Sequence, residues 1–350
     1  MKNYFFCSIV LICTIYAIND DLYARQFRGS FPKSRTAGSY SSHAVQQKKS
    51  VPQPAAPQSK SEVSEAEKSK TAATSQGLTV VETPETPSPE AVLAPLSWES
   101  SFPLAIEKAK AEKKMVLVLI TQSGTEKQTD KMAQWIAEPQ NRPILDRSYV
   151  LVQVDGSANV DFAGKTGPIL QKPEFREMGR KAGIAIIDFQ NDDYLGKVVG
   201  AFPLIRLQYS SFHINQILTL PPGTLTQRML TFAIRVHPNR PQSANGRPSC
   251  FLMKLAFGHA CNQASTHVMG HQNFSSRSSQ VMRAHPGTQS SEICAQTGGG
   301  VALIGALGLA QLWRGSSAHW SAMKSPSRGW GYDMQRSNNG NWYGCGLFAK

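Results

Sequence analysis

The feature that most limits the fold of this chain is a long segment, residues 25–96, that cannot form a hydrophobic core. The segment consists mainly of Ser, Pro, Gln, Ala and Lys, and large apolar residues are scarce after Tyr40. Such a composition buries too little apolar surface to offset the chain entropy lost on folding. We therefore predict a disordered linker here. Of the 350 residues, those from 97 onward remain to fold, which is enough for two ordinary domains.

The first 24 residues are typical of a secretory signal peptide. Lys2 supplies a positive start, and Tyr4 to Ile18 form an apolar run that is short for a membrane span. Asp20 and Asp21 fit a cleavage region poorly, so an uncleaved N-terminal membrane anchor is the alternative. We expect a protein that is secreted or held in the cell envelope or periplasm.

The formal net charge of +13 is unevenly distributed along the chain. Basic residues between Arg25 and Lys60 have no acidic residue among them, so part of the excess belongs to a basic N-terminal arm. No zinc finger, helix-turn-helix or RNA-binding aromatic motif accompanies that arm. The pattern argues against a nucleic-acid partner and favours contact between the arm and anionic envelope polymers.

From Trp98 to residue 205, apolar runs alternate with patterns of helical period. We predict a helix that ends at Lys113 and Lys114, further helices at 126–137 and 173–181, and strands at 115–120, 149–154, 184–189 and 195–199. Short connections between alternating elements predict an α/β domain. The segment from Tyr209 to Leu218 has no clear pattern.

Several of these elements together resemble a thioredoxin-like domain covering residues 97–205: Trp98, the helix AIEKAKAEKK, the strands VLVLI and LVQVD, and Gly200. Thiol–disulfide chemistry in that family needs cysteines at the start of the helix after the central strand, where the helix dipole lowers the thiol pKa. Here that position reads from Gln122 to Gln128 without a cysteine, and Ala185 stands where the family has a cis-proline. We therefore predict no thiol–disulfide oxidoreductase activity and a structural or partner-binding role.

Two helices are expected after this domain. Thr224 or Thr226 can cap the first, which carries an apolar stripe that includes Leu230 and Phe232 and stops at Pro238. The second spans about 250–269, with apolar residues on one side. Of its histidines, His259 and His267 are weak site candidates, because a histidine on a helix is commonly solvated or satisfied within the core.

The C-terminal residues add an ordered set of motifs: a His followed by an aromatic residue and an Arg, a Glu that opens a strand, a helical Trp and His six residues apart, a glycine-spaced strand and an aromatic closing strand. The set resembles the CAP superfamily of cysteine-rich secretory, venom-allergen and pathogenesis-related proteins, over residues 219–350 and closest to the bacterial secreted branch. The resemblance implies a CAP-like α-β-α sandwich in residues 206–350. It rests on His271, Phe274, Arg277, Glu292, Trp313, Ser316, His319, Gly329, Gly331, Trp342 and Phe348.

The departures from the CAP pattern bear on function. Ile293 follows Glu292 where the family has Asn, and Ala318 replaces the Gly before His319. Many eukaryotic members carry a second Glu on the Trp helix, and here that region offers Ser316 and Ser317, as in the bacterial branch. The second acid that a mechanism with two carboxylates requires is therefore missing.

The resemblance implies that His271, Glu292 and His319 meet in one cleft. Two neutral imidazoles can bind zinc or another divalent cation, with Glu292 as a ligand or as an orienting group. Alternatively, one histidine acts as a general base on water, or the three residues form a buried hydrogen-bond network. No nucleophile elbow, zinc-protease motif or Ser/His/Asp set is present in the sequence.

The CAP resemblance therefore implies an exported, non-catalytic binding module associated with the envelope. Its partner would be an extracytoplasmic protein, a glycan or a small apolar ligand. The alternative is a metal-dependent or His/Glu-assisted hydrolase that acts on peptide or cell-envelope material. In both cases the cleft is the predicted functional locus.

Four of the six cysteines would remain after removal of a signal peptide, namely Cys250, Cys261, Cys294 and Cys345. In an exported chain they indicate up to two disulfides, with three pairings open. Cys250 and Cys261 would lie about 16 Å apart along one helix and cannot pair with each other. We expect Cys294 to pair with Cys345, the alternative being that the cysteines are buried free thiols.

Overall fold

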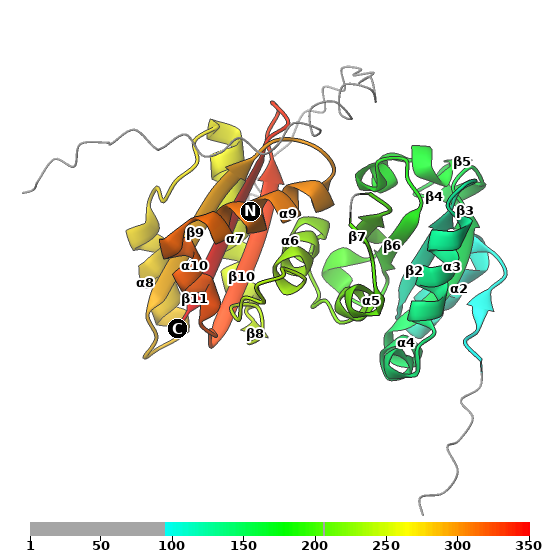
Figure 1. Cartoon of the computed structure of the whole chain (residues 1–350), viewed down its shortest axis with the longest axis horizontal. Coiled ribbons are helices and arrows are strands. Elements are labelled where there is room, and N and C mark those ends of the chain that lie inside the picture. The colour runs from blue at the N-terminus through cyan, green and yellow to red at the C-terminus, as the bar shows by residue number, and fades with distance from the viewer. Residues whose placement is uncertain (1–94, 206) are drawn as a thin grey trace, which may run out of the picture. The chain divides into compact units, whose positions relative to one another are not determined.

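The computed structural model describes residues 95–205 and 207–350, which belong to one compact unit of the chain that begins at Thr86. The predicted signal peptide, and the predicted linker up to residue 94, lie outside the described residues. The described part combines a five-stranded sheet, a four-stranded sheet and a two-stranded hairpin with helices (Figure 1). The predicted mixture of α and β structure is thereby confirmed.

The five-stranded sheet has the order β1-β3-β2-β6-β7. Its strands are β1 (Trp98–Glu99), β2 (Met115–Thr121), β3 (Tyr149–Asp155), β6 (Gly183–Asp188) and β7 (Lys197–Pro203). Strand β3 runs parallel to β1 and β2, whereas β6 is antiparallel to β2 and β7. These are the order and directions expected of a thioredoxin-like sheet. The central strand β2 is buried on both faces, which explains its continuous apolar run.

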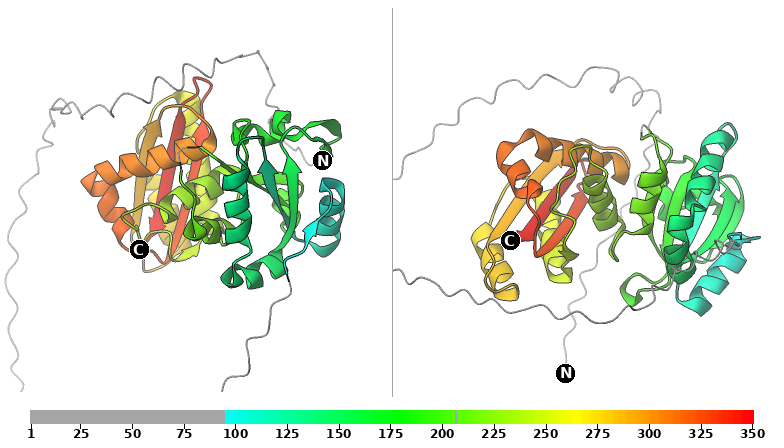
Figure 2. Two further views of the ribbon diagram at one scale, coloured as in Figure 1. Left: turned by 45° about the vertical axis from the view of Figure 1, so that its right-hand side comes forward. Right: turned by 60° about the horizontal axis from the view of Figure 1, so that its bottom comes forward.

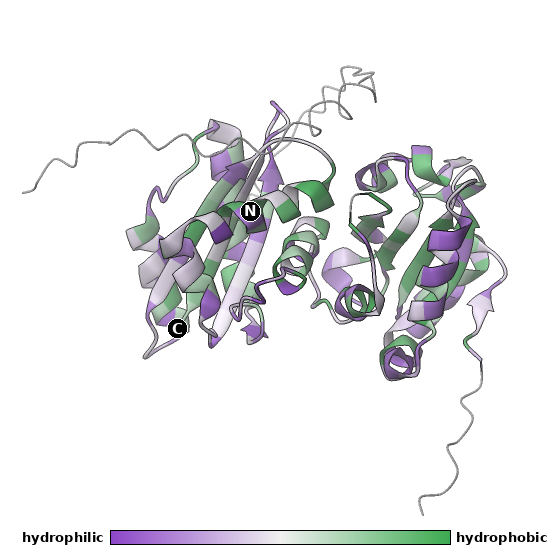
Figure 3. Ribbon diagram, viewed as in Figure 1, coloured by the Kyte–Doolittle hydropathy of each residue, from purple (hydrophilic) through white to green (hydrophobic). Residues whose placement is uncertain are grey.

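Helices cover both faces of this sheet. On one face, α2 (Phe102–Glu112) packs its buried residues with Val116 and Val118 of β2. On the other, α3 (Glu126–Ile136) and α4 (Arg142–Ser148) pack with Leu117 and Leu119. Figure 3 shows apolar residues along the strands and polar residues on the outward sides of the helices. The alternation along β2 therefore places one apolar set on each face.

Several local predictions in this half were wrong. The helix expected at 173–181 is a short 3-10 helix, Pro173–Met178, which ends at Gly179 with φ of 58°. A hairpin that was not predicted, β4 (Asn159–Phe162) and β5 (Lys165–Pro168), follows β3. Ala185 was expected at the position of the family's cis-proline, which precedes the corresponding strand. In the structure Ala185 lies inside β6, so it does not occupy that position.

The four-stranded sheet has the order β8-β10-β11-β9. Its strands are β8 (Arg247–Pro248), β9 (Ser290–Thr297), β10 (Gly329–Arg336) and β11 (Trp342–Ala349). Strand β11 is antiparallel to both β10 and β9, and β8 is parallel to β10. Strand β9 is therefore an edge strand, so side chains from beyond the sheet can reach its outer side.

Two helical layers enclose this sheet, as the three views in Figures 1 and 2 show. Helices α7 (Cys250–Thr266) and α8 (Phe274–Ala284) pack on one face through the cluster that contains Leu252, Val281 and Leu347. The other face is packed by α6 (Leu225–Arg235), α9 (Ala302–Gly315) and α10 (Ser317–Lys324). The arrangement is an α-β-α sandwich, and α5 (Ser211–Leu218) precedes it in the chain.

Close packing explains one glycine of the C-terminal pattern. A Cβ at Gly331 of β10 would lie 2.3 Å from the backbone of Leu252 and of Met253 in α7. A contact of that length is far inside van der Waals separation, so any side chain would push the helix away from the sheet.

The predicted caps and ends were partly correct. Thr224 caps α6 through a capping box with Gln227. The chain from Trp313 to His319 is divided between two helices, because Ser316 is extended and starts α10 as its N-cap residue.

Among the described residues, no helix combines the length and the apolar character that a membrane crossing requires.

Candidate functional site

Strand β9 carries the acidic residue of the site. Successive side chains of a strand point to opposite faces, so Glu292 and Cys294 share one face while Ile293 and Ala295 share the other. Ile293 and Ala295 join the core with α9, and Cys294 joins the cluster under α7 and α8. The strand thereby directs the carboxylate of Glu292 toward the α7 and α8 layer.

The carboxylate of Glu292 is fully buried and fully hydrogen-bonded. Arg277 of α8 donates from Nε to Oε2 at 2.6 Å and from Nη2 to Oε1 at 2.9 Å. His271, in the loop between α7 and α8, donates from Nδ1 to Oε1 at 2.9 Å. Burial by itself would raise the pKa of Glu292, but hydrogen bonds from His271 and Arg277 outweigh it and lower that pKa. Glu292 is therefore an ionised group held between two cations.

His271 is the exposed end of this network. Its side chain is 46% exposed, whereas that of Glu292 beneath it is 0% exposed. Hydrogen bonds to Cys294 and then to Glu292 raise the pKa of His271 to about 10, against the opposing effect of burial. Because Nδ1 donates to the carboxylate, the half-exposed ring is held in place as a charged donor at the surface.

His319 reaches the same place from the other helical layer. It belongs to α10, near the edge strand β9, and its ring centroid is 5.9 Å from that of His271. Partial burial, and then the positive charge of His271, lower the pKa of His319. The structure thus brings the predicted residues His271, Glu292 and His319 together, with one charged and one neutral imidazole side by side.

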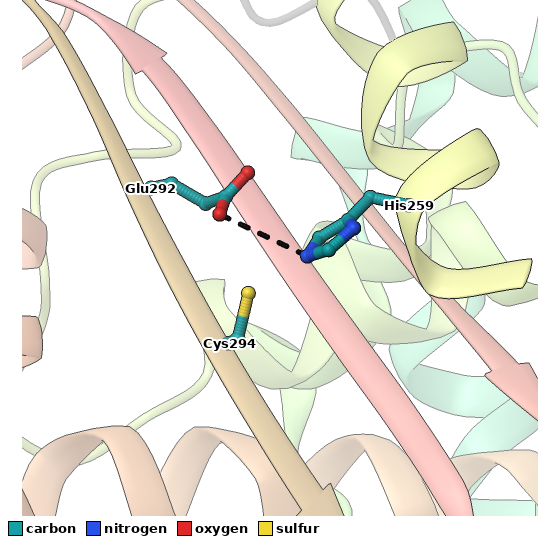
Figure 4. A group of neighbouring side chains, drawn as sticks. All are labelled: His259, Glu292 and Cys294. Carbon is teal, nitrogen blue, oxygen red and sulfur yellow. Dashed lines mark ion pairs between the residues drawn. The ribbon is translucent and has the colours of Figure 1, made fainter. Parts of the chain in front are cut away.

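Two further residues belong to this cluster: His259, which the sequence indicated only as a weak site candidate, and Cys294, which was expected in a disulfide. His259 lies on α7, and its Nε2 is 3.8 Å from Oε1 of Glu292 (Figure 4). Burial, the largest effect, lowers the pKa of His259, but hydrogen bonding to Cys294 and Gly270 outweighs it, so the net pKa is raised. The sequence did contain one indication for Cys294: it stands two residues after Glu292 in a predicted strand, so both side chains should lie on the same face.

The predicted disulfide between Cys294 and Cys345 is wrong. The two residues face each other on β9 and β11, yet both are buried free thiols. Side chains opposite each other in an antiparallel pair stand side by side, and Cys294 Sγ accepts a hydrogen bond from Gln263 Nε2 at 3.5 Å. A hydrogen bond from Cys345 lowers the pKa of Cys294, while burial raises that of Cys345.

The pair His271 and His319 does not by itself make a complete zinc site. Nδ1 of His271 and both oxygens of Glu292 are already hydrogen-bonded, which leaves one ring nitrogen of His271 and the ring of His319. Catalytic zinc sites use three protein ligands. The positive charge on His271 also opposes a cation in the cleft. The predicted zinc site therefore lacks a third ligand within the described part of the chain.

The corresponding position of the first sheet has a different character. Gln122 follows β2, where a redox cysteine would be expected. Its Oε1 accepts from the backbone N–H of Ala182 at 2.7 Å, and its Nε2 donates to the carbonyl of Arg180 at 3.2 Å. The side chain therefore ties the loop before β6 to the start of α3.

Comparison of the chain with protein-family models and with curated proteins found no match. The CAP and thioredoxin-like assignments therefore rest on the residues and geometry described above, and the functional roles of His271, Glu292 and His319 remain predictions.

Proposed function

We propose that this protein is an exported, non-catalytic binding module of the cell envelope, and that its ligand site is the cleft that the CAP resemblance predicts between His271 and His319. The proposal combines the predicted secretory signal and CAP resemblance with the geometry of the second sheet. The thioredoxin-like half would act as a structural or partner-binding domain.

One observation carries this proposal. The carboxylate of Glu292 is wholly buried, and both of its oxygens accept hydrogen bonds from Arg277 or His271. A carboxylate in that state is a poor general base, because it is strongly stabilised as an ion and does not reach water. It is well suited to orient His271 and to keep that ring protonated. The protonated ring of His271 then offers the ligand a hydrogen-bond donor in a fixed position and does not act as a proton acceptor.

The charge of the cleft indicates the class of ligand. An imidazolium presented at the surface favours anionic groups and hydrogen-bond acceptors, and the neutral ring of His319 supplies a second polar contact beside it. Envelope glycans that carry carboxylates, and acidic segments of extracytoplasmic proteins, both offer such groups. We commit to the glycan, since the basic N-terminal arm would favour the same polymer surface.

The experiment measures how much of the full chain sediments with purified peptidoglycan sacculi at pH 7. We expect His271→Gln to weaken binding about tenfold, because hydrogen bonds to charged groups contribute about 1.5–3 kcal/mol. His267→Gln is the matched control, since His267 is exposed at the end of α7 and outside the cluster. All variants keep the basic arm. Equal binding by the wild type and His271→Gln would disprove the proposal.

A hydrolase is the second candidate, and one observation favours it. The environments of His271 and His319 move their pKa values in opposite directions, so one ring is an acid and its neighbour a neutral base at pH 7. Paired groups with separated pKa values are typical of acid–base catalysis. In this mechanism His319 would take a proton from water and His271 would donate one to the leaving group.

The hydrolase reading is tested by release of soluble fragments from the same sacculi and from an unstructured peptide. If it holds, His319→Gln abolishes release, and Glu292→Gln does so without a large change in melting temperature. If Glu292→Gln mainly unfolds the protein, the residue is structural. Absence of any fragment from the wild-type chain would leave binding as the function of the cleft.

A further inference from the structure

A second set of donor atoms lies beneath the cleft. A ring nitrogen of His259, a carboxylate oxygen of Glu292 and Sγ of Cys294 all lie within 4.8 Å of one another, and all three residues are buried. Figure 4 shows their side chains pointing toward one another, with His259 coming from α7 and the other two from β9. His259 has no part in the binding function proposed above, and Cys294 contributes to it only by helping to raise the pKa of His271.

Cys345 adds a second sulfur at this place. It stands directly opposite Cys294 in the pairing of β11 with β9, and both thiols are free and buried. Gln263 and His271 also hydrogen-bond Cys294. The rest of the buried cluster consists of small or apolar side chains: Leu252, Ala256, Ala260, Val281, Leu347 and Ala349. Cys294 lies beside the buried imidazole of His259, and Cys345 stands next to Cys294, so three donors to soft metals are concentrated in one part of the core.

We propose that Cys294, Cys345 and His259 form a buried binding site for a thiophilic cation of the zinc class. Thiolate and imidazole donors are the set that zinc prefers, with Zn–S distances of about 2.3 Å and Zn–N distances of about 2.0–2.1 Å. Two thiolates balance the charge of the divalent cation, and their two protons are released on binding. The sulfur of Cys345 is not among the donor atoms that lie within 4.8 Å of one another, so metal binding requires the Cys345 side chain to turn toward His259 and Cys294.

Glu292 is the weakest donor of the set and serves as a supporting group. Its oxygens already accept from Arg277 at 2.6 and 2.9 Å, so coordination would leave that guanidinium without its partner. His259 must release the hydrogen bond from its Nε2–H to the carbonyl of Gly270, which is 2.9 Å long. Gly270 lies in the loop between α7 and α8, where φ is 155°, so the adjustment falls on a loop and not on the sheet.

The test uses the full chain, reduced and stripped of metal with a chelator, and titrated with Co²⁺ and then Zn²⁺. We expect one Co²⁺ per chain, a near-ultraviolet thiolate-to-cobalt absorption band, and loss of that band when Zn²⁺ displaces the cobalt. Cys294→Ser and Cys345→Ser each abolish the band, and His259→Gln weakens cobalt binding at least about tenfold. Zn²⁺ also raises the melting temperature of the wild type and not that of the cysteine variants.

Two controls locate the site. The double variant Cys250→Ser, Cys261→Ser keeps the other thiols of the folded part and should retain the band. His319→Gln should also retain it, which separates this site from a metal site in the cleft. Cys294→Ala, with a melting transition recorded without metal, serves if the serine variant does not fold.

The proposal is overturned if wild-type protein shows no thiolate band at any Co²⁺ concentration. It is equally overturned if the band survives Cys294→Ala in folded protein, or if it disappears in His319→Gln. Binding to sacculi is measured without metal, so failure of this site and failure of the cleft as a ligand site are distinguishable.

Discussion

The two sheets differ at the positions where the sequence resemblances predict functional residues, namely Gln122 after β2 and Glu292 on β9. After β2 of the first sheet, the side chain of Gln122 hydrogen-bonds backbone groups of Ala182 and Arg180. On β9 of the second sheet, Glu292 is buried with Arg277 and beside His271. The neutral amide completes the backbone hydrogen bonds of a loop. The buried ion pair goes beyond what the fold requires, since apolar residues of similar size commonly stabilise a core as well or better.

The difference shows where to look for function. A buried charge is costly to desolvate, and a site that keeps one uses it for positioning or for setting the charge of a neighbour. The neutral side chain of Gln122 sets the charge of no titratable group among the described residues. We therefore propose that the function of the molecule lies at the edge of the second sheet, and the following experiments test that contrast.

The largest effect is expected for Arg277→Met. The change leaves the buried carboxylate of Glu292 with His271 as its remaining hydrogen-bonded cation. Breaking a buried pair by removing one partner costs about 3–5 kcal/mol of stability. Urea unfolding at pH 7 measures the loss. A loss below about 1 kcal/mol would mean that Glu292 is effectively hydrated and that the contrast between the two sheets is incorrect.

A smaller loss is expected for Gln122→Ala. Two hydrogen bonds to backbone groups disappear, and the N–H of Ala182 loses its acceptor. We expect a cost of about 1–2 kcal/mol in urea unfolding, and unchanged binding to sacculi. Reduced binding in this variant, with the fold intact, would place a functional surface on the first sheet instead.

The dependence of stability on pH separates His271 from ordinary histidines. The pKa of His271 is raised from 6.5 to about 10 in the folded state, so its stabilising effect is complete below pH 6.5 and is lost as pH rises toward 10. We expect the melting temperature to fall across that window in the wild type and less so in His271→Gln. Parallel profiles for the two proteins would show that His271 gains no stabilising partner on folding.

The smallest effect concerns Asp333, a buried acid without a basic partner. Burial raises its pKa from 3.8 to about 7, and its Oδ2 has no hydrogen-bond partner within the described residues. The cost of keeping Asp333 buried therefore grows as pH rises from 3.8 to 7 and then stays constant. Asp333→Asn removes the charge but leaves an unpaired amide N–H₂, so we expect a gain below about 1 kcal/mol at pH 8.

At pH 4 the same variant should gain nothing, because the acid is protonated in the folded wild type. Denaturant unfolding at the two pH values provides the comparison. A gain of equal size at both would show that the charge of Asp333 is not what the substitution relieves.

The sequence predicted the elements whose apolar residues follow a clear period. Strands β2, β3, β6, β10 and β11 and helices α3, α6 and α7 agree with their patterns to within a few residues. Helix α8 was not predicted, because among its residues only Val281 is buried and the apolar stripe is therefore too weak to recognise. The break at Ser316 was missed because its cause is a cap contact rather than a change in composition.

The site was predictable only in part, for a physical reason. The CAP resemblance predicted that His271, Glu292 and His319 lie together, and the structure brings them together. The approach of His259 to Cys294 depends on how α7 packs across β10 and β11, and no local pattern encodes a contact between elements so far apart. The predicted disulfide between Cys294 and Cys345 was wrong for a different reason. The strand register does place the two residues opposite each other, but that position alone does not bond their sulfurs.

The most direct test of this account is an NMR titration of the two ring signals of His271 and His319 in the folded, metal-free chain. The account predicts that the pKa of His271 lies well above the ordinary value of 6.5 and that the pKa of His319 lies below it. In Glu292→Gln the pKa of His271 should fall but stay above the ordinary value, because the hydrogen bond to Cys294 remains. If both rings of the wild type titrate near 6.5, the buried carboxylate does not set the charge of the cleft, and the proposed binding site is contradicted.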